Sequence, residues 1–136
     1  MVEITKTLRV GNPLDAGVDI GPMENLGQLR VVEEHVRDAV EKGAEILCGG
    51  GRLEGRPGYF FAPTILAKVD HTMKIMTEET FGPVLPVMTF RDPEDAVALA
   101  NDCHYGLTAS VWTRNKKTAE WAARRLEAGT VTINDH

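Results

Sequence analysis

Helix-like and strand-like hydrophobic patterns alternate along this chain, and their order constrains the fold more than any other feature. Apolar residues at steps of three and four predict an amphipathic helix over 26–42, with Gly43 as its C-terminal stop. Asp92 before Pro93 joins a favoured N-cap to a favoured first helical residue, which predicts a helix over 93–101. Other patterns predict a helix over 116–128 and strands over 44–48, 59–66, 84–90, 107–112 and 130–134. Because strands joined through helices usually pair in parallel, we expect an α/β fold with a mostly parallel sheet covered by helices.

Composition indicates an ordinary globular protein and excludes several classes of function. The 136 residues suit a single domain over 1–136, and 43% of them are hydrophobic. The formal net charge is −5 and no basic stripe is present, so nucleic acid is not an expected partner. No apolar run is long enough to span a bilayer, and the N-terminus does not resemble a signal peptide, so no membrane association is expected. Cys48 and Cys103 form no C-x-x-C pair or disulfide framework, which favours a reducing, cytoplasmic setting.

Two carboxylates followed by an aromatic ring and a Gly-Pro turn occupy residues 77–84, directly before the strand predicted over 84–90. An ionised carboxylate only accepts hydrogen bonds, so the pair Glu78-Glu79 suits a diol such as a ribose edge. Phe81 offers a flat apolar face, and Gly82-Pro83 would hold it at a defined angle. The residues alone favour a plainer interpretation, in which the acidic pair is a solvated turn and the phenylalanine belongs to the core.

Other chemical signatures are not found. Gly49-Gly50-Gly51 begins like a dinucleotide fingerprint, but Glu54 stands where the last glycine belongs and no helix follows, so we interpret it as a loop. The four histidines lack metal-ligand spacing, so no metal site is predicted. His104 beside Cys103 suggests a thiolate–imidazole pair, yet chain neighbours rarely turn their side chains together, and a surface loop is the preferred interpretation.

The segment Glu-Glu-Thr-Phe-Gly-Pro-Val at 78–84 resembles the Glu-Glu-x-Phe-Gly-Pro-Val motif of the aldehyde dehydrogenase superfamily. Four further segments match that family in the same order, and together the five cover essentially the whole chain. These are V-G-N-P-L-D at 10–15 with G-P at 21–22, G-Y-F-x-x-P-T-I at 58–65, N-x-x-x-Y-G-L-T-A-S-V at 101–111, and G-T-V-x-x-N at 129–134.

The resemblance implies that the catalytic groups of the family lie outside this chain. In aldehyde dehydrogenases a cysteine thiolate attacks the aldehyde, an asparagine side chain and a backbone N–H hold the oxyanion, and a glutamate assists hydrolysis. In the family all of these, and the dinucleotide-binding domain, precede the V-G-N-P-L-D segment at 10–15. Cys48 and Cys103 match positions that the family does not use for catalysis. We therefore expect a fragment of a catalytic domain, with no catalytic residue of its own and no activity in isolation.

What the resemblance leaves within the chain is a cofactor-binding motif. It implies that Glu79 binds the nicotinamide ribose hydroxyls of NAD or NADP and that Phe81 packs near the nicotinamide. Gln28 lies about where some family members contact the same ribose. The parent enzyme would oxidise a small-molecule aldehyde to a carboxylic acid and would be a homo-oligomer.

Two other interpretations remain open on the sequence. The chain could be a stand-alone binding or assembly module of the same fold without catalysis, or part of a related reductase acting on an acyl phosphate. The genomic sequence upstream would distinguish a stand-alone module from a fragment. An open reading frame that reaches a Gly-Gln-x-Cys-type motif would establish a fragment. The reductases match the segment at 79–84 less well.

Overall fold

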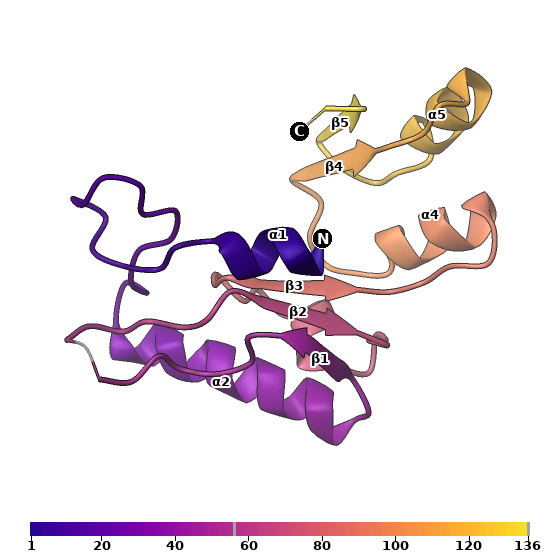
Figure 1. Cartoon of the computed structure of the whole chain (residues 1–136). Coiled ribbons are helices and arrows are strands. Elements are labelled where there is room, and N and C mark those ends of the chain that lie inside the picture. The colour runs from indigo at the N-terminus through magenta and orange to yellow at the C-terminus, as the bar shows by residue number, and fades with distance from the viewer. Residues whose placement is uncertain (56, 136) are drawn as a thin grey trace. The chain divides into compact units, whose positions relative to one another are not determined.

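The computed structural model describes residues 1–55 and 57–135, and its contacts divide the chain into two units, Met1–Met88 and Thr89–His136 (Figure 1). The single domain expected over 1–136 stays a prediction. The helices and strands described in the first unit are α1 (Val2–Thr7), α2 (Leu26–Glu41), β1 (Glu45–Cys48), β2 (Thr64–Ala67), α3 (Lys74–Thr77) and β3 (Val84–Val87). Those described in the second unit are α4 (Pro93–Asn101), β4 (Thr108–Val111), α5 (Lys116–Ala123) and β5 (Thr130–Ile133).

The sheet of the first unit has the strand order β1-β2-β3. Strand β2 pairs with β3 in parallel, with Ile65 opposite Leu85, whereas β1 and β2 are antiparallel. The described residues between β1 and β2, 49–55 and 57–63, form no helix that would carry the chain over a face of the sheet, and an antiparallel pair needs none. Pro86 lies in β3 at the sheet edge, as its missing N–H predicts, and β2 begins directly after Pro63.

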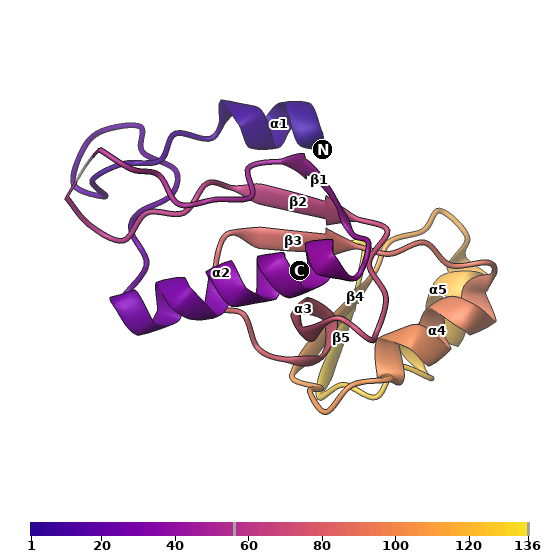
Figure 2. The ribbon, with the colours of Figure 1, turned by 90° about the horizontal axis from the view of Figure 1, so that it is seen from below.

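Helix α2 forms as predicted and supplies much of the core. Asn25 caps its first turn by accepting from the backbone of Gln28 at 2.9 Å, and Gly43 follows with a φ of 102°. The buried face of the helix packs against β2 and the segments around it, and Figures 1 and 2 show α1 and α2 on opposite sides of the sheet. The core residues are Leu29, Val32, Val36, Ala39, Ala44, Phe61, Leu66, Val69, Met73 and Ile75. Val40, which was expected on the apolar face, is 42% exposed.

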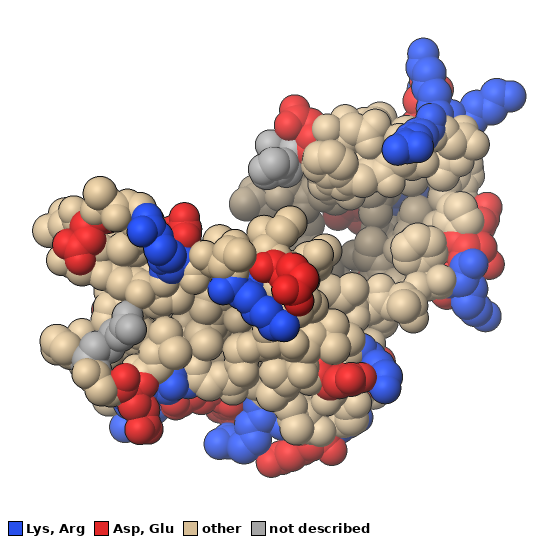
Figure 3. Space-filling view, viewed as in Figure 1, with Lys and Arg blue, Asp and Glu red and all other residues tan. Residues whose placement is uncertain are grey.

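Two short helices, α1 and α3, were not predicted, because neither is long enough to show a helical hydrophobic period. The strands predicted over 44–48, 59–66 and 84–90 are each reduced to four residues. Charged side chains of both signs are interspersed on the visible face of this unit in Figure 3, and Lys6 of α1 pairs with Glu3 at 3.3 Å.

The second unit pairs β4 with β5 in parallel, and α5 provides the crossover between them. Asp92 accepts from Asp95 N at 2.8 Å at the start of α4, as its place before Pro93 predicts. The helix predicted over 116–128 is wrong at its end, since α5 stops at Ala123. Asn101 explains the early stop, because its side chain donates to Arg125 O at 2.8 Å and accepts from Glu127 N at 3.0 Å. These two bonds hold residues 125–127 against the last residue of α4.

The strands predicted over 107–112 and 130–134 are confirmed with shorter bounds. Two of the three strand pairings are parallel, so the predicted α/β class with a mostly parallel sheet is confirmed. Among the described residues, no helix combines the length and apolar character needed to cross a bilayer.

Candidate functional site

The segment 78–83, which we call the acidic loop, connects α3 to β3 and is tied down at both ends. Its first residue, Glu78, donates its backbone N–H to Lys74 O at 2.8 Å, in continuation of α3. At the other end Thr64 N donates to Pro83 O at 2.8 Å, which fixes the loop to the first residue of β2. The loop therefore leads directly into β3, as the sequence pattern indicated, and it is also bonded to the buried strand β2.

Phe81 has an uncommon backbone conformation at the tip of this loop. Its φ is 37°, in the left-handed region that residues with a side chain rarely adopt, and its side chain is 73% exposed. The alternative that this phenylalanine belongs to the core is therefore wrong. A large ring presented to solvent on a strained backbone needs neighbouring groups that hold the backbone in place.

Gln28, in the first turn of α2, supplies one of these holding contacts. Its side-chain Nε2 donates to Thr80 O at 2.7 Å and lies 3.4 Å from Phe81 O. The amide nitrogen is therefore directed at the loop backbone, and the amide oxygen is the atom through which Gln28 could accept from a ligand hydroxyl. The structure thus brings together all three residues that the sequence singled out, around the acidic loop.

His35 is a part of this site that the sequence analysis missed. It lies on the buried face of α2 with 3% exposure, and its Nδ1 is 2.9 Å from Thr80 Oγ1. Its Nε2 is 3.3 Å from Glu78 Oε2. The sequence carried one signal, since His35 directly precedes Val36 in an apolar stripe where a polar group needs partners.

The two carboxylates of the loop therefore differ in their surroundings. Both are exposed, but Glu78 contacts His35, whereas the carboxylate of Glu79 has no hydrogen-bond or ion-pair partner among residues 1–55 and 57–135. An exposed carboxylate next to an exposed ring is free to accept from hydroxyl groups and to stack on a planar group. This combination of a hydrogen-bond acceptor and an aromatic face fits a ligand that carries both a diol and a flat ring.

Helix α3, which leads into the loop, is anchored to α2 by charged groups. Lys74 pairs with Glu34, and its backbone N–H donates to Asp38 Oδ2 at 2.8 Å. The Lys74 ammonium lowers the pKa of Glu34, and the carboxylate of Glu34 in turn raises the pKa of Lys74. Hydrogen bonds from Lys42 and from the Lys74 backbone lower the pKa of Asp38. Each of these contacts favours the charged forms at neutral pH.

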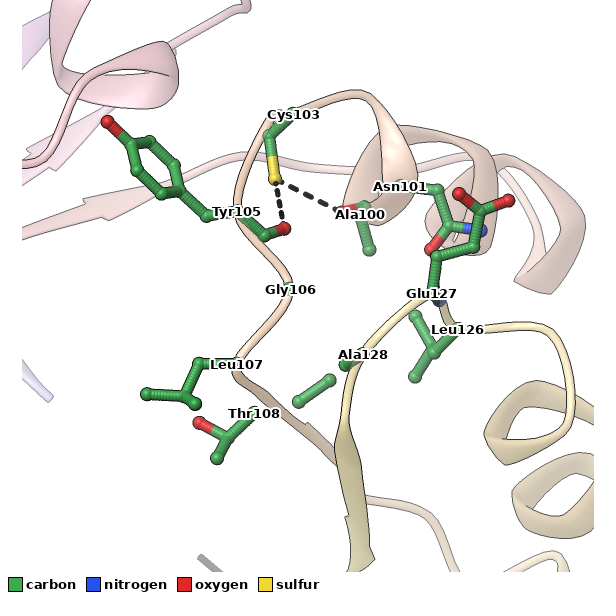
Figure 4. Close-up of a pocket in the computed structure, with 11 residues that line it drawn as sticks. Ala100, Asn101, Cys103, Tyr105, Gly106, Leu107, Thr108, Leu126, Glu127 and Ala128 are labelled. Carbon is green, nitrogen blue, oxygen red and sulfur yellow. Dashed lines mark hydrogen bonds between the residues drawn. The ribbon is translucent and has the colours of Figure 1, made fainter.

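The two other segments examined in the sequence are loops, as interpreted. Gly49-Gly50-Gly51 follows β1 without opening a helix, and Gly50 N donates to Thr64 Oγ1 at 2.8 Å. Cys103 is exposed, its Sγ donates to Tyr105 O at 3.1 Å (Figure 4), and no hydrogen bond joins it to His104 among the described residues. An open pocket of about 270 Å³ lies beside it, lined by the turn at 103–108 and the segment 126–128.

Comparison with known proteins defines the class. The model of the aldehyde dehydrogenase family matches residues 1–136, and the chain belongs to that family. A Staphylococcus aureus (strain bovine RF122 / ET3-1) protein, whose name places it among the aldehyde dehydrogenases, is 45% identical over 130 residues. Those residues are 94% of this chain and 27% of the relative, so the chain spans about a quarter of the length of the curated relatives it matches.

Solved structures agree with this membership. A lactaldehyde dehydrogenase matches with a TM-score of 0.95 and 43% sequence identity. The match covers 99% of the present chain and 28% of the chain of that enzyme. The betaine aldehyde dehydrogenase of Staphylococcus aureus, solved in complex with NAD+, matches with a TM-score of 0.93 and 36% identity. This match covers 98% of the present chain and 27% of the chain of the betaine aldehyde dehydrogenase. The chain therefore corresponds in fold to part of an aldehyde dehydrogenase, as its motifs suggested.

Proposed function

We propose that this chain is the part of an NAD(P)+-dependent aldehyde dehydrogenase that binds the nicotinamide ribose of the cofactor. The parent enzyme would oxidise a small-molecule aldehyde to a carboxylic acid. Its nucleophilic cysteine and its dinucleotide-binding domain would lie outside residues 1–136. Membership of the family supports the reaction class, and the NAD+ complex of the betaine aldehyde dehydrogenase supports the cofactor.

One observation carries the assignment of the site: the acidic loop leaves Glu79 without a partner among the described residues and Phe81 73% exposed. In this proposal Glu79 accepts hydrogen bonds from the two ribose hydroxyls, and Phe81 packs beside the nicotinamide ring. Gln28 holds the loop backbone through its amide nitrogen, and its oxygen is available to the same ribose. The bound cofactor supplies the hydride acceptor, and the chain's own residues orient it.

The parent enzyme is further proposed to be a cytoplasmic homo-oligomer. Both cysteines of the chain, Cys48 and Cys103, are free thiols, which supports a reducing compartment. Family membership is the support for an oligomer.

The experiment that tests the proposed function compares two proteins. The complete protein containing this chain should form NADH or NADPH from NAD(P)+ and an aldehyde, whereas the purified 136-residue chain should not, because covalent catalysis needs the thiolate itself. Aldehyde-dependent NADH formation by the 136-residue chain would contradict the assignment of the nucleophile to another part of the enzyme. Failure of the complete protein with a broad panel of aldehydes would contradict the reaction class.

A further inference from the structure

Three side chains of α2 form a stripe that faces the acidic loop. Gln28, Val32 and His35 are four and three residues apart, so they lie one above another on the same side of the helix. Gln28 bonds to the loop carbonyls, and Val32 packs so closely that a Cβ built on Gly82 would lie 2.5 Å from Val32 Cγ2. His35 completes the stripe, and its ring contacts Glu78 and Thr80, the residues directly before and after Glu79 in the sequence.

The two nitrogens of the His35 ring contact two different residues of the acidic loop. On one side Nε2 lies 3.3 Å from Glu78 Oε2, an atom that can only accept, so a hydrogen or a positive charge on this side of the ring makes the contact attractive. On the other side Nδ1 shares a hydrogen bond of 2.9 Å with the Thr80 hydroxyl, which can donate or accept according to the tautomer of the ring. One buried ring therefore holds residues 78 and 80 of the loop at once.

This double contact decides which carboxylate of the pair points outward. Glu78 has extended backbone angles, φ −119° and ψ 151°. Since alternate side chains of an extended chain point to the same side, the contacts of residues 78 and 80 with His35 favour the opposite side for Glu79, which has no partner among the described residues. A shift of one residue would direct Glu79 at the helix and Glu78 at the ligand.

We infer that His35 is a positioning residue for cofactor binding, acting through Glu78 and Thr80. It fixes the register of the acidic loop, so that Glu79 and Phe81 are presented to the nicotinamide ribose. This role rests on the proposed function, because it supposes that Glu79 is the ribose ligand. His35 itself does not touch the cofactor.

The test uses the complete enzyme and four variants. His35→Leu removes both ring contacts, and Thr80→Val removes the hydroxyl from the loop side while leaving the α2 core intact. His35→Gln keeps an amide N–H that can donate to Glu78. His104→Leu, in the exposed turn of the other unit, is the matched control histidine.

We expect kcat to fall about 10- to 100-fold in His35→Leu and Thr80→Val, since small misplacements of reacting groups cost that much. The KM for the aldehyde should change by less than about threefold, because in the proposed function this loop binds the cofactor and not the aldehyde. His35→Gln should recover activity to within about tenfold of the wild type, and His104→Leu should match the wild type. If His35 were only structural, its replacement would lower the fraction of folded enzyme. His35→Gln would then not recover activity, and kcat would not fall while the KM stayed nearly constant.

A second readout needs neither cofactor nor activity. Hydrogen exchange of the backbone amides at 78–82 in the cofactor-free enzyme should speed up in His35→Leu and Thr80→Val and return toward wild type in His35→Gln. Unchanged exchange and unchanged kcat in both disrupting variants would overturn the positioning role. Faster exchange with unchanged kcat would overturn it too, leaving His35 as a loop anchor without effect on the reaction.

Failure of the proposed function is recognised separately through Glu79→Gln. If Glu79→Gln slows the reaction and His35→Leu does not, only the role of His35 is overturned. If Glu79→Gln leaves the reaction unchanged, the ribose assignment itself is wrong and the positioning role falls with it, whatever the exchange data show.

Discussion

The side-chain nitrogen of Gln28 donates to the backbone carbonyl of Thr80 at 2.7 Å, across 52 positions of the sequence. This bond crosses from the first turn of α2 to the residue directly before Phe81, whose φ is 37°. A helix capped by Asn25 thereby holds a strained loop from outside, since a residue in the left-handed region keeps its angles only where its surroundings impose them. The hydrogen bond from Gln28 therefore helps to keep Phe81 in its left-handed backbone conformation.

Replacing Gln28 should loosen this arrangement. Gln28→Met keeps the length of the side chain but removes the donor, so a part-buried carbonyl loses its partner and the free energy of unfolding should fall by about 1–2 kcal/mol. Urea denaturation measures the loss. Arg30→Met is the control, because Arg30 is exposed on the same helix, and its effect should stay within about 0.5 kcal/mol. Equal losses in the two variants would mean that the Gln28–Thr80 bond contributes nothing specific.

The packing of Gly82 on Val32 gives a second prediction. A Cβ at Gly82 would lie 2.5 Å from Val32 Cγ2, and Val32 is fully buried, so Gly82→Ala should destabilise by about 1–3 kcal/mol. In a Val32→Ala background the same change should cost much less, because the clashing methyl group is gone. A double-mutant cycle of urea denaturations measures this coupling, and additive effects would show that the two residues are not in conflict. Gly51→Ala, where a Cβ meets no described heavy atom within 4 Å, is the control.

The carboxyl group of Asp38 should make stability fall with acid. Its pKa in the folded protein is lowered by Lys42 and by the Lys74 backbone, so it binds a proton less readily than in the unfolded chain. A group with a lowered folded pKa contributes stability that is present above its unfolded pKa and lost as the pH falls through the folded value. Asp38→Asn should therefore be less stable than wild type at neutral pH, and the two should converge once the pH falls below the lowered pKa of Asp38 in the folded protein. A constant difference across the acid range would contradict this origin.

The two cysteine thiols should react with a thiol reagent at different rates, but neither should be unusually reactive. Cys103 is exposed and Cys48 is half-buried, so a thiol reagent at neutral pH should label Cys103 first. Among the described residues no Lys, Arg or His is bonded to the Cys103 sulfur, which donates to backbone oxygens instead. Timed labelling should give a Cys103 rate no greater than that of a free peptide cysteine. A rate far above it would restore the Cys103–His104 pair as a reactive site.

The sequence predicted those parts of the fold that are governed by local rules. The apolar period over 26–42 and the Asp92-Pro93 cap gave α2 and α4, because helix faces and caps are set by neighbouring residues. The end of α5 could not be predicted, since Ala123 is followed by residues held by Asn101, which is distant in sequence. The antiparallel pairing of β1 with β2 likewise depends on a long connection whose course the local pattern does not encode.

The candidate site divides in the same way. Its motif identified Glu79 and Phe81, but it did not show that Glu78 faces a buried His35. That contact joins residues 43 positions apart, and a histidine in an apolar stripe looks like any other core residue until its partners are placed. The left-handed φ of Phe81 was not predicted either, since the sequence places the freedom for unusual backbone angles at Gly82.

The most direct test of the central claim, that Glu79 holds the nicotinamide ribose, is the pre-steady-state burst of NADH in the complete enzyme. A carboxylate accepting from hydroxyls contributes about 1.5–3 kcal/mol per bond, so Glu79→Gln should slow the burst by about tenfold or more. Glu78→Gln retains an acceptor oxygen for His35 and should slow it much less. If Glu78→Gln slows the burst and Glu79→Gln does not, the wrong carboxylate has been assigned; if neither does, the acidic pair is a solvated turn and the account of the site is wrong.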